Sequence, residues 1–241
     1  MQRATWVAGV AMWMAAVACG HRDDNAIPEA NVTPVPGKLS VAPASADRDV
    51  AAHGGSIPRG YVAQLDAADA SIADASYRED GTGRWEVRTG PAHIVYALGD
   101  TTRKSYAVTA TFEQLEAPVH PEAYGIFVGG SSLDDPAKRQ YTYVILRGDG
   151  KYAIKARNGT SVRTVKDWTA HPAIPTQDAS GKALYGLRID VDGKTAKVSV
   201  NGKPVTTFTT KDGPLEGITG VRINHNLHLM VTPVTVTRRL S

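Results

Sequence analysis

The sequence predicts an all-β fold for most of the chain, in the form of an antiparallel β-sandwich or jelly roll. From Trp85 onward, short runs of alternating apolar and polar residues follow one another, which is the pattern of half-buried strands. Asn-Gly and Asp-Gly dipeptides, whose glycines supply the positive φ of tight hairpin turns, separate several of these runs. The sequence of this part shows no convincing long helix. Many short strands joined by tight turns are typical of a sandwich.

Four turn dipeptides each lie between two alternating runs, and each one predicts a β-hairpin. The four are Asp149-Gly150, Asn158-Gly159, Asp192-Gly193 and Asn201-Gly202. Because a hairpin joins neighbouring antiparallel strands, these dipeptides also predict which strands pair.

The strands themselves follow from the alternation. Tyr106, Val108 and Phe112, for example, alternate with smaller or polar residues, so one face of this strand is expected to enter a core. The segment 61–75 fits either a short helix or a lead-in strand, and both alternatives stay open. The predicted strands are residues 93–98, 105–115, 123–129, 140–147, 152–157, 161–168, 184–191, 196–200, 205–209, 220–224 and 227–237.

Residues 1–18 predict an export signal. Arg3 is followed by an uncharged stretch and then by small residues, which is the layout of a signal peptide. Residues 16–20 resemble the lipobox of bacterial lipoproteins, although Ala16 stands where leucine is usual. This resemblance implies a lipid on Cys19, the single cysteine of the 241 residues, and a protein facing the periplasm or cell surface. A plain secretory signal cut near Ala18 is the alternative.

Residues 19–60 predict a disordered tether, and residues 61–241 form the predicted folded domain. The tether is rich in Ala, Pro, Asp, Gly, Ser and Asn, and its sequence has no apolar periodicity. Such a segment buries too little apolar surface to offset its chain entropy. Membrane attachment is therefore expected through the N-terminal lipid anchor only.

Composition excludes several functions. A single cysteine cannot form an internal disulfide or a cysteine-based zinc cluster. The 27 Lys and Arg against 24 Asp and Glu give a formal net charge of +3, and the basic residues are spread along the chain. We therefore expect no nucleic-acid partner and no cofactor.

Five segments carry a family resemblance. In residues and in order they resemble the concanavalin A-like lectin/glucanase (laminin G-like) sandwich of exported bacterial proteins, including its sugar-hydrolase-like branch. The likeness covers residues 85–237 and implies a concanavalin A-like fold that engages a glycan or a cell-envelope component. The segments are YGIFVGG at 124–130, QYTYVILRGDGKY at 140–152, DWTAHPAI at 167–174, LRIDVDG at 187–193 and VSVNGKPV at 198–205.

The carboxylates argue against catalysis. Laminarinase-type members of this superfamily carry Glu-x-Asp-x-x-Glu on one strand, and the sequence has no such string. Asp190 and Asp192 form an acidic pair, but the third carboxylate of the motif is missing and Asp192 belongs to a predicted turn. Asp134 and Asp135 could contribute to a calcium site, although exposed loop acids are common. We expect a non-catalytic binding module, with a glycoside hydrolase using carboxylates from separate strands as the alternative and a purely structural envelope protein as a third possibility.

One row of polar residues is a candidate ligand site. Four polar residues stand at alternate positions and would point to one face of a strand, while the apolar residues between them would point to the other face. The four are Arg222, Asn224, Asn226 and His228. If these strands line a concave sheet, the four side chains form a hydrogen-bonding row suited to sugar hydroxyls. A solvated outer sheet face is the simpler interpretation. His225 and His228 have the wrong parity for a zinc pair on one strand face.

Two further groups have structural interpretations. Lys151, Lys155 and Arg157 share a strand face and predict a charged, solvent-facing surface that discourages edge pairing. Six aromatic residues are expected in the core or on a sheet face rather than as ligand platforms. They are Tyr124, Phe127, Tyr143, Tyr152, Trp168 and Phe208.

Overall fold

The computed structural model describes residues 56–238, which lie within the unit Ser45–Ser241. The predicted signal peptide, Cys19 and nearly all of the predicted tether lie outside the described residues, so their assignment stays a prediction. Within the described part, no helix is both long enough and apolar enough to span a membrane.

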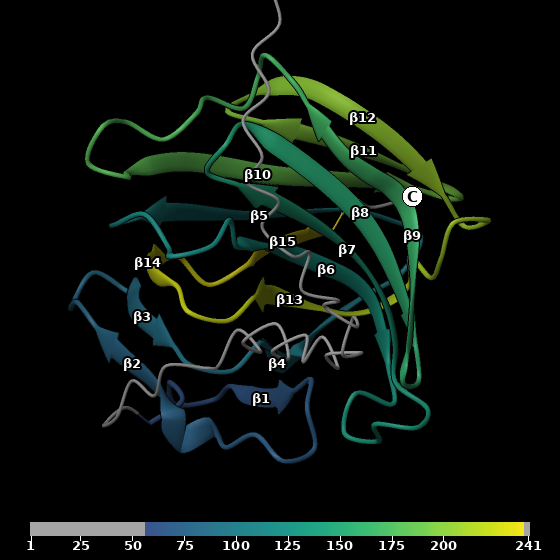
Figure 1. Cartoon of the computed structure of the whole chain (residues 1–241). Helices are drawn as coiled ribbons and strands as arrows, with labels where there is room; N and C mark the ends of the chain where they lie inside the picture. The colour runs from purple at the N-terminus through teal and green to yellow at the C-terminus, as the bar shows by residue number, and fades with distance from the viewer. Residues whose placement is uncertain (1–55, 239–241) are drawn as a thin grey trace, which may run out of the picture. The chain divides into compact units, whose positions relative to one another are not determined.

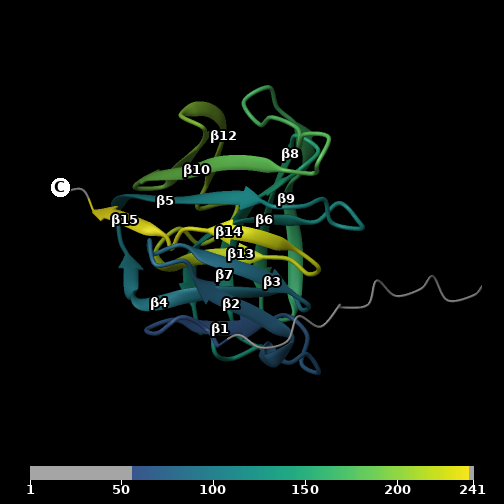
Figure 2. The same ribbon diagram turned by 90° about the vertical axis from the view of Figure 1, so that its left-hand side faces the viewer.

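The described strands form two antiparallel sheets (Figure 1). The seven-stranded sheet has the order β1 (Val62–Leu65), β4 (His93–Thr102), β13 (Gly217–Ile223), β6 (Ala123–Ser131), β7 (Gln140–Arg147), β8 (Lys151–Asn158) and β9 (Ser161–Ala170). The eight-stranded sheet has the order β12 (Lys203–Thr209), β11 (Thr195–Val200), β10 (Ala183–Asp192), β5 (Ser105–Gln114), β14 (His228–Val231), β3 (Trp85–Thr89) and β2 (Ala75–Glu79), with β15 (Thr235–Arg238) also paired to β5. Figure 2 shows β10, β5, β14, β3 and β2 one after another.

The predicted fold class is confirmed, and so are the four hairpin turns. Gly150, Gly159, Gly193 and Gly202 have φ of 80°, 58°, 54° and 75°, and each lies in a turn between paired strands. Only glycine enters this region of φ at little steric cost. The local turn chemistry therefore fixes the β7–β8–β9 and β10–β11–β12 meanders.

The N-terminal part of the domain contains strands that were not predicted. The sequence leaves a short helix and a lead-in strand both open for segment 61–75, and the segment contains one of each: the strand β1 and the short 3-10 helix η1 (Ile72–Asp74). The short strands β2 and β3 follow it. The predicted strand 227–237 is divided into β14 and β15. Pro233 lies between these two strands and cannot donate a backbone hydrogen bond.

The main core lies between the sheets. Phe112 of one sheet packs against Tyr124 of the other with ring centroids 5.5 Å apart, and Tyr124 stacks on Tyr185 at 6.0 Å. All three side chains are fully buried. The alternation predicted for β5 and β10 is thus confirmed, since their apolar parity points into this core.

The seven-stranded sheet is apolar on both of its faces. Val95, Ile126 and Val144 belong to the core between the sheets, whereas their chain neighbours Phe127 and Tyr143 belong to a second cluster. Successive residues of a strand point to opposite faces, so the second cluster lies on the face turned away from the eight-stranded sheet. This face, called the outer face below, carries the candidate site.

The aromatic side chains follow their predicted roles with one partial exception. Five of the six are buried in one of the two clusters, and Trp168 is half-buried at the edge of the second. The five buried residues are Tyr124, Phe127, Tyr143, Tyr152 and Phe208.

Candidate functional site

The outer face collects charged side chains around the carboxylate of Asp66, which directly follows β1. Asp66 Oδ2 accepts a hydrogen bond from Nη2 of Arg222 on β13 at 2.7 Å. Asp66 Oδ1 lies 2.9 Å from Nη1 of Arg157 on β8, as an ion pair without hydrogen-bond alignment. Arg139, in the loop before β7, donates from Nη1 to the carbonyl of Leu65 at 2.8 Å. We call Asp66, Arg139, Arg157 and Arg222 the Asp66 cluster.

The three arginines of the cluster are buried, and Asp66 is partly buried among them. Burial would raise the pKa of Asp66, but the charge and hydrogen bond of Arg222, together with the charges of Arg157 and Arg139, hold it below its ordinary value. Burial in turn would lower the pKa of Arg222, and Asp66 raises it instead. Arg222 also lies over the ring of Tyr143, with its guanidinium carbon 5.6 Å from the ring centroid. Asp66 is therefore the counter-charge that makes burial of Arg222 tolerable.

A second carboxylate, Glu122, continues the network from the start of β6. Arg222 Nε donates to Oδ1 of Asn224 at 3.2 Å, and Asn224 Nδ2 donates to Oε2 of Glu122 at 3.0 Å. His225 Nε2 lies 2.8 Å from Oε1 of the same carboxylate. Hydrogen bonds thus run continuously from Asp66 through Arg222 and Asn224 to Glu122.

An aromatic platform lies at the end of β7. The guanidinium of Arg147 stacks over Trp168 at 4.4 Å from the ring centroid. Arg147 also donates two hydrogen bonds to Asp149, at 2.9 and 2.5 Å, and Lys151 lies 3.1 Å from that carboxylate. These hydrogen bonds from Arg147 are the main reason why the pKa of Asp149 is lowered. Arg147 shares the parity of Tyr143 on β7, so this platform belongs to the outer face.

Two cavities flank Asp66. The larger has a volume of about 520 Å³, and Leu65, Asp66, Arg139 and Arg157 are among its lining residues. The smaller, of about 220 Å³, is lined by Asp66, Ala67, Pro91, Ala92 and His225. In the part of the chain that the structure describes, the buried atoms Arg139 Nε and Arg222 Nη1 have no hydrogen-bond partner.

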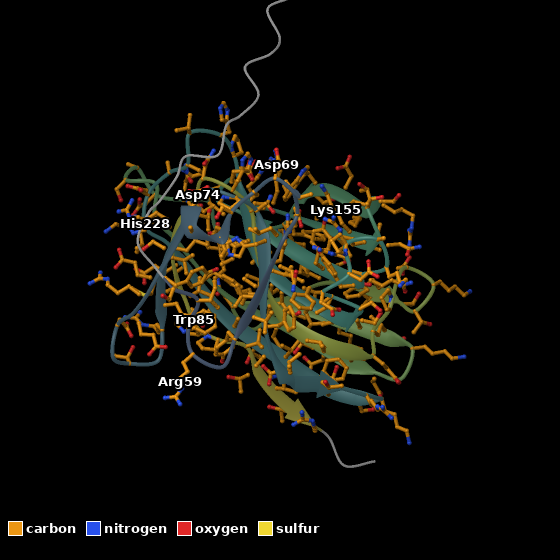
Figure 3. All side chains as sticks on the ribbon, turned by 90° about the horizontal axis from the view of Figure 1, so that it is seen from below. Arg59, Asp69, Asp74, Trp85, Lys155 and His228 are labelled. Atoms are coloured by element: carbon orange, nitrogen blue, oxygen red, sulfur yellow. The ribbon has the colours of Figure 1, made fainter. Side chains whose placement is uncertain are left out.

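The four predicted ligand residues do not form one row. Arg222 and Asn224 belong to the outer-face network, whereas Asn226 lies in the following turn with φ of 52°. His228 begins β14 in the other sheet and contacts Glu86 and Glu116. Figure 3 shows His228 far from Lys155 of the outer face. The expectation of a shared sheet face is wrong because the chain crosses between the sheets after Asn224, and ligand binding by these four residues stays a prediction.

The interpretation of the β8 charges also needs correction. Lys151, Lys155 and Arg157 do share a face, but Arg157 is buried and paired with Asp66. The strand β8 pairs with both β7 and β9, so it is not a sheet edge. Arg157 therefore belongs to the Asp66 cluster rather than to a solvent face, whereas Lys151 and Lys155 are partly exposed, as predicted.

The histidines and loop acids have separate partners. His225 contacts Glu122, whereas His228 contacts carboxylates of a different region. Asp135 accepts from the amide of Ala137 and pairs with Lys138. Among residues 56–238, no group of three or more His, Cys, Asp or Glu side chains is arranged to hold a metal ion.

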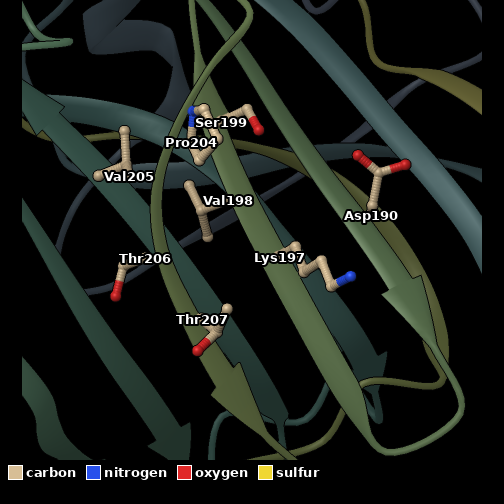
Figure 4. A pocket seen from close by; sticks show the side chains of 8 residues that line it. All are labelled: Asp190, Lys197, Val198, Ser199, Pro204, Val205, Thr206 and Thr207. Carbon is tan, nitrogen blue, oxygen red and sulfur yellow. The ribbon is translucent and has the colours of Figure 1, made fainter.

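A groove also lies on β10, β11 and β12, at one end of the eight-stranded sheet (Figure 4). It has a volume of about 660 Å³, and its lining includes Lys197, Ser199, Thr206 and Thr207 but no aromatic residue. Asp190 at its border accepts two hydrogen bonds from Arg188, each 2.7 Å long. The groove thus lacks the aromatic ring that the outer face offers.

The sequence matches no family model and no characterised protein. Its fold, in contrast, resembles solved structures. The carbohydrate-binding module CBM66 from Bacillus subtilis superposes with a TM-score of 0.53 at 8% identity, over 74% of this chain and 96% of that chain. A Bacillus subtilis protein of unknown function with a galectin-like fold gives a TM-score of 0.52 at 14% identity, over 74% and 90%.

The fold is a jelly-roll β-sandwich similar to those of this carbohydrate-binding module and of the galectin-like protein. This confirms the jelly-roll fold that the predicted resemblance implies, and the likeness at these identities concerns the fold alone. Alginate lyase A1-II′, of polysaccharide lyase family 7, matches more loosely, with a TM-score of 0.48 at 11% identity over 74% of this chain and 94% of that chain. The laminin G-like and lipoprotein parts of the resemblance stay predictions.

Proposed function

We propose that this protein is a non-catalytic glycan-binding module of the cell envelope, exported and held at a membrane by lipid on Cys19. The observation that carries the binding proposal is the outer-face network from Asp66 through Arg222 and Asn224 to Glu122, with Trp168 on the same face.

The chemistry of this face matches that of a sugar. A sugar ring presents hydroxyl groups that both donate and accept hydrogen bonds, together with apolar C–H surfaces. Guanidinium, amide and carboxylate groups offer several hydrogen-bonding atoms in fixed geometry. Arg147 covers one face of the half-buried Trp168 ring, so the C–H face of a sugar would pack on the opposite face of the indole. A few placed polar groups beside an aromatic surface are typical of small-molecule sites.

Two further observations support binding rather than hydrolysis. A carbohydrate-binding module is among the proteins that share this fold. A glycoside hydrolase needs one carboxyl group that stays protonated at its working pH. On the outer face the arginines instead lower the pKa values of Asp66, in the network, and of Asp149, beside Arg147, so both are ionised.

Removing the aromatic platform is expected to weaken glycan binding. The variant Trp168→Ala should bind a retained glycan about fivefold more weakly, because stacking on one aromatic ring contributes on the order of 1 kcal/mol. The measurement is a screen of the purified full-length protein against polysaccharides, followed by calorimetric titration of those that bind. Thermal melting checks that the variant is folded.

The polar network is tested by Glu122→Gln, with Glu113→Gln as its matched control. Glu113 lies on β5 of the other sheet and pairs with Arg84 at 3.8 Å. Binding should weaken in the Glu122 variant and stay unchanged in the Glu113 variant. The proposal fails if the folded wild-type protein retains no polysaccharide, or if both glutamine variants bind equally well.

The anchor is tested by Cys19→Ser expressed in a bacterium. The wild-type protein should incorporate labelled fatty acid and sediment with membranes, because each buried methylene contributes about 0.8 kcal/mol and several acyl chains give stable attachment. The serine variant should do neither, whereas Ser40→Ala, a control in the predicted tether, should behave as wild type. Labelling of the serine variant contradicts the assignment, and an unlabelled wild type indicates a plain secretory signal.

A further inference from the structure

The larger cavity beside Asp66 has an unusual charge balance. Arg139 and Arg157 line it, and Arg222 holds Asp66 from β13. Arg222 is not among the residues that line the cavity. Counted with it, the three guanidinium groups of the Asp66 cluster face one carboxylate, which leaves an excess of two positive charges in the cluster. The nearby Asp135 does not correct this excess, since Lys138 already pairs with it at 3.0 Å.

The donors of the cluster are incompletely used. Arg139 is 2% exposed and Arg222 is 5% exposed, yet Arg139 Nε and Arg222 Nη1 have no hydrogen-bond partner among the described residues. A buried donor without a partner is costly, and such groups are rare in folded proteins. The oxygen of an anionic ligand is the acceptor that best compensates a guanidinium donor.

From the excess charge, the cavity and the unused donors, we infer that this pocket binds an oxyanion carried by the glycan, such as the carboxylate of a uronic acid. This inference rests on the proposed glycan-binding function and deepens it. Planar guanidinium groups bind carboxylate, sulfate and phosphate through paired N–H donors, whereas neutral hydroxyls gain less from them. The protein would therefore select acidic polysaccharides over neutral ones.

The decisive comparison uses two polymers that differ in charge alone. Polygalacturonate and the neutral galactan obtained by reducing its carboxyl groups are titrated separately into the full-length protein. We expect polygalacturonate to bind at least about tenfold more tightly, with an affinity that falls as salt is added. Dextran sulfate against dextran tests a sulfated source of the oxyanion, and inorganic phosphate tests a free one.

Variants assign the effect to this pocket. Arg139→Gln should weaken polygalacturonate binding about tenfold, because it removes one charge and the unused Nε donor. Asp66→Asn should tighten binding, because it removes the negative charge while its amide oxygen still accepts from Arg222. Arg188→Gln, which removes an arginine paired with Asp190 on the other sheet, should leave binding unchanged. Thermal melting shows that each variant is folded at the temperature of titration.

The outcomes separate this inference from the proposed function. If galactan binds as tightly as polygalacturonate, the inference is wrong and glycan binding stands. If neither a polymer nor phosphate binds, both are wrong. If phosphate binds in an Arg139-dependent way and no polymer does, the pocket takes a free oxyanion and the glycan source is overturned. If Arg139→Gln and Asp66→Asn weaken binding equally, the cluster has a structural role and the inference is overturned.

Discussion

The variant Asp66→Ala is expected to lose about 3–5 kcal/mol of unfolding free energy, the range typical for removing one partner of a buried ion pair. Asp66 is the carboxylate partner of both Arg222 and Arg157, which are 5% and 8% exposed. Its removal leaves two buried guanidinium groups without their counter-charge. Urea denaturation of the full-length protein, followed by tryptophan fluorescence, measures the loss.

Two companion variants sharpen this prediction. Asp69→Ala removes an exposed carboxylate three residues further along the chain and should change stability by less than about 0.5 kcal/mol. Asp66→Asn should cost less than the alanine variant, because its amide oxygen still accepts the hydrogen bond of Arg222. A loss below about 1 kcal/mol for Asp66→Ala would show that the arginines do not depend on this carboxylate.

Acidification is expected to destabilise the domain through His93. This residue is fully buried between the sheets, and burial lowers the pKa of its imidazole from 6.5 to about 4. Its Nδ1 donates to the carbonyl of Pro91 at 2.8 Å, and its Nε2 contacts the hydroxyl of Tyr77 on β2. The neutral ring thus connects β4 of one sheet to β2 of the other.

The sign and size follow from proton binding. Between pH 6.5 and about 4, the unfolded chain binds a proton at this histidine and the folded domain does not. Unfolding is therefore favoured as the pH falls, by about 1.4 kcal/mol per pH unit and by about 3 kcal/mol over the whole interval. Above pH 6.5 both states have a neutral ring, and this contribution to stability is fully present.

His93→Gln isolates the contribution, because glutamine does not titrate. Unfolding free energies measured between about pH 7 and about pH 4 should fall less steeply in this variant than in the wild type, by about 3 kcal/mol in total. Protonation of carboxylates such as Asp66 also lowers the unfolding free energy in acid, but it does so in both proteins. His120→Gln, at an exposed position, should retain the wild-type slope. Parallel slopes for the wild type and His93→Gln would contradict the prediction.

The outer-face site could be predicted from the sequence only in part. Arg222 and Asn224 stood out because they alternate with apolar residues at the end of a predicted strand, and both belong to the network. Asp66 and Glu122 carried no such signal. Asp66 lies in a segment whose secondary structure was ambiguous, and Glu122 lies in a loop just before β6.

Local information was sufficient for the strands from 140 to 209. Alternation and Asn-Gly or Asp-Gly turns act within a few residues, so neighbouring strands and their pairing could be derived directly from the chain. The same alternation predicted the core side of β5 and β10, since a strand buried on one face must present its apolar parity there.

Long-range packing determined everything that defines the site. Arg222 meets Asp66 across 156 positions of sequence, and no local pattern specifies that contact. The strands β13 and β14 belong to different sheets, so His228 does not lie in the predicted row. The alternation of polar and apolar residues indicates which face of a strand a residue occupies, but it does not indicate which sheet contains that strand. The sandwich class and its hairpins are thus properties of the amino-acid pattern, whereas the charged pocket exists because the folded sheets bring distant side chains together.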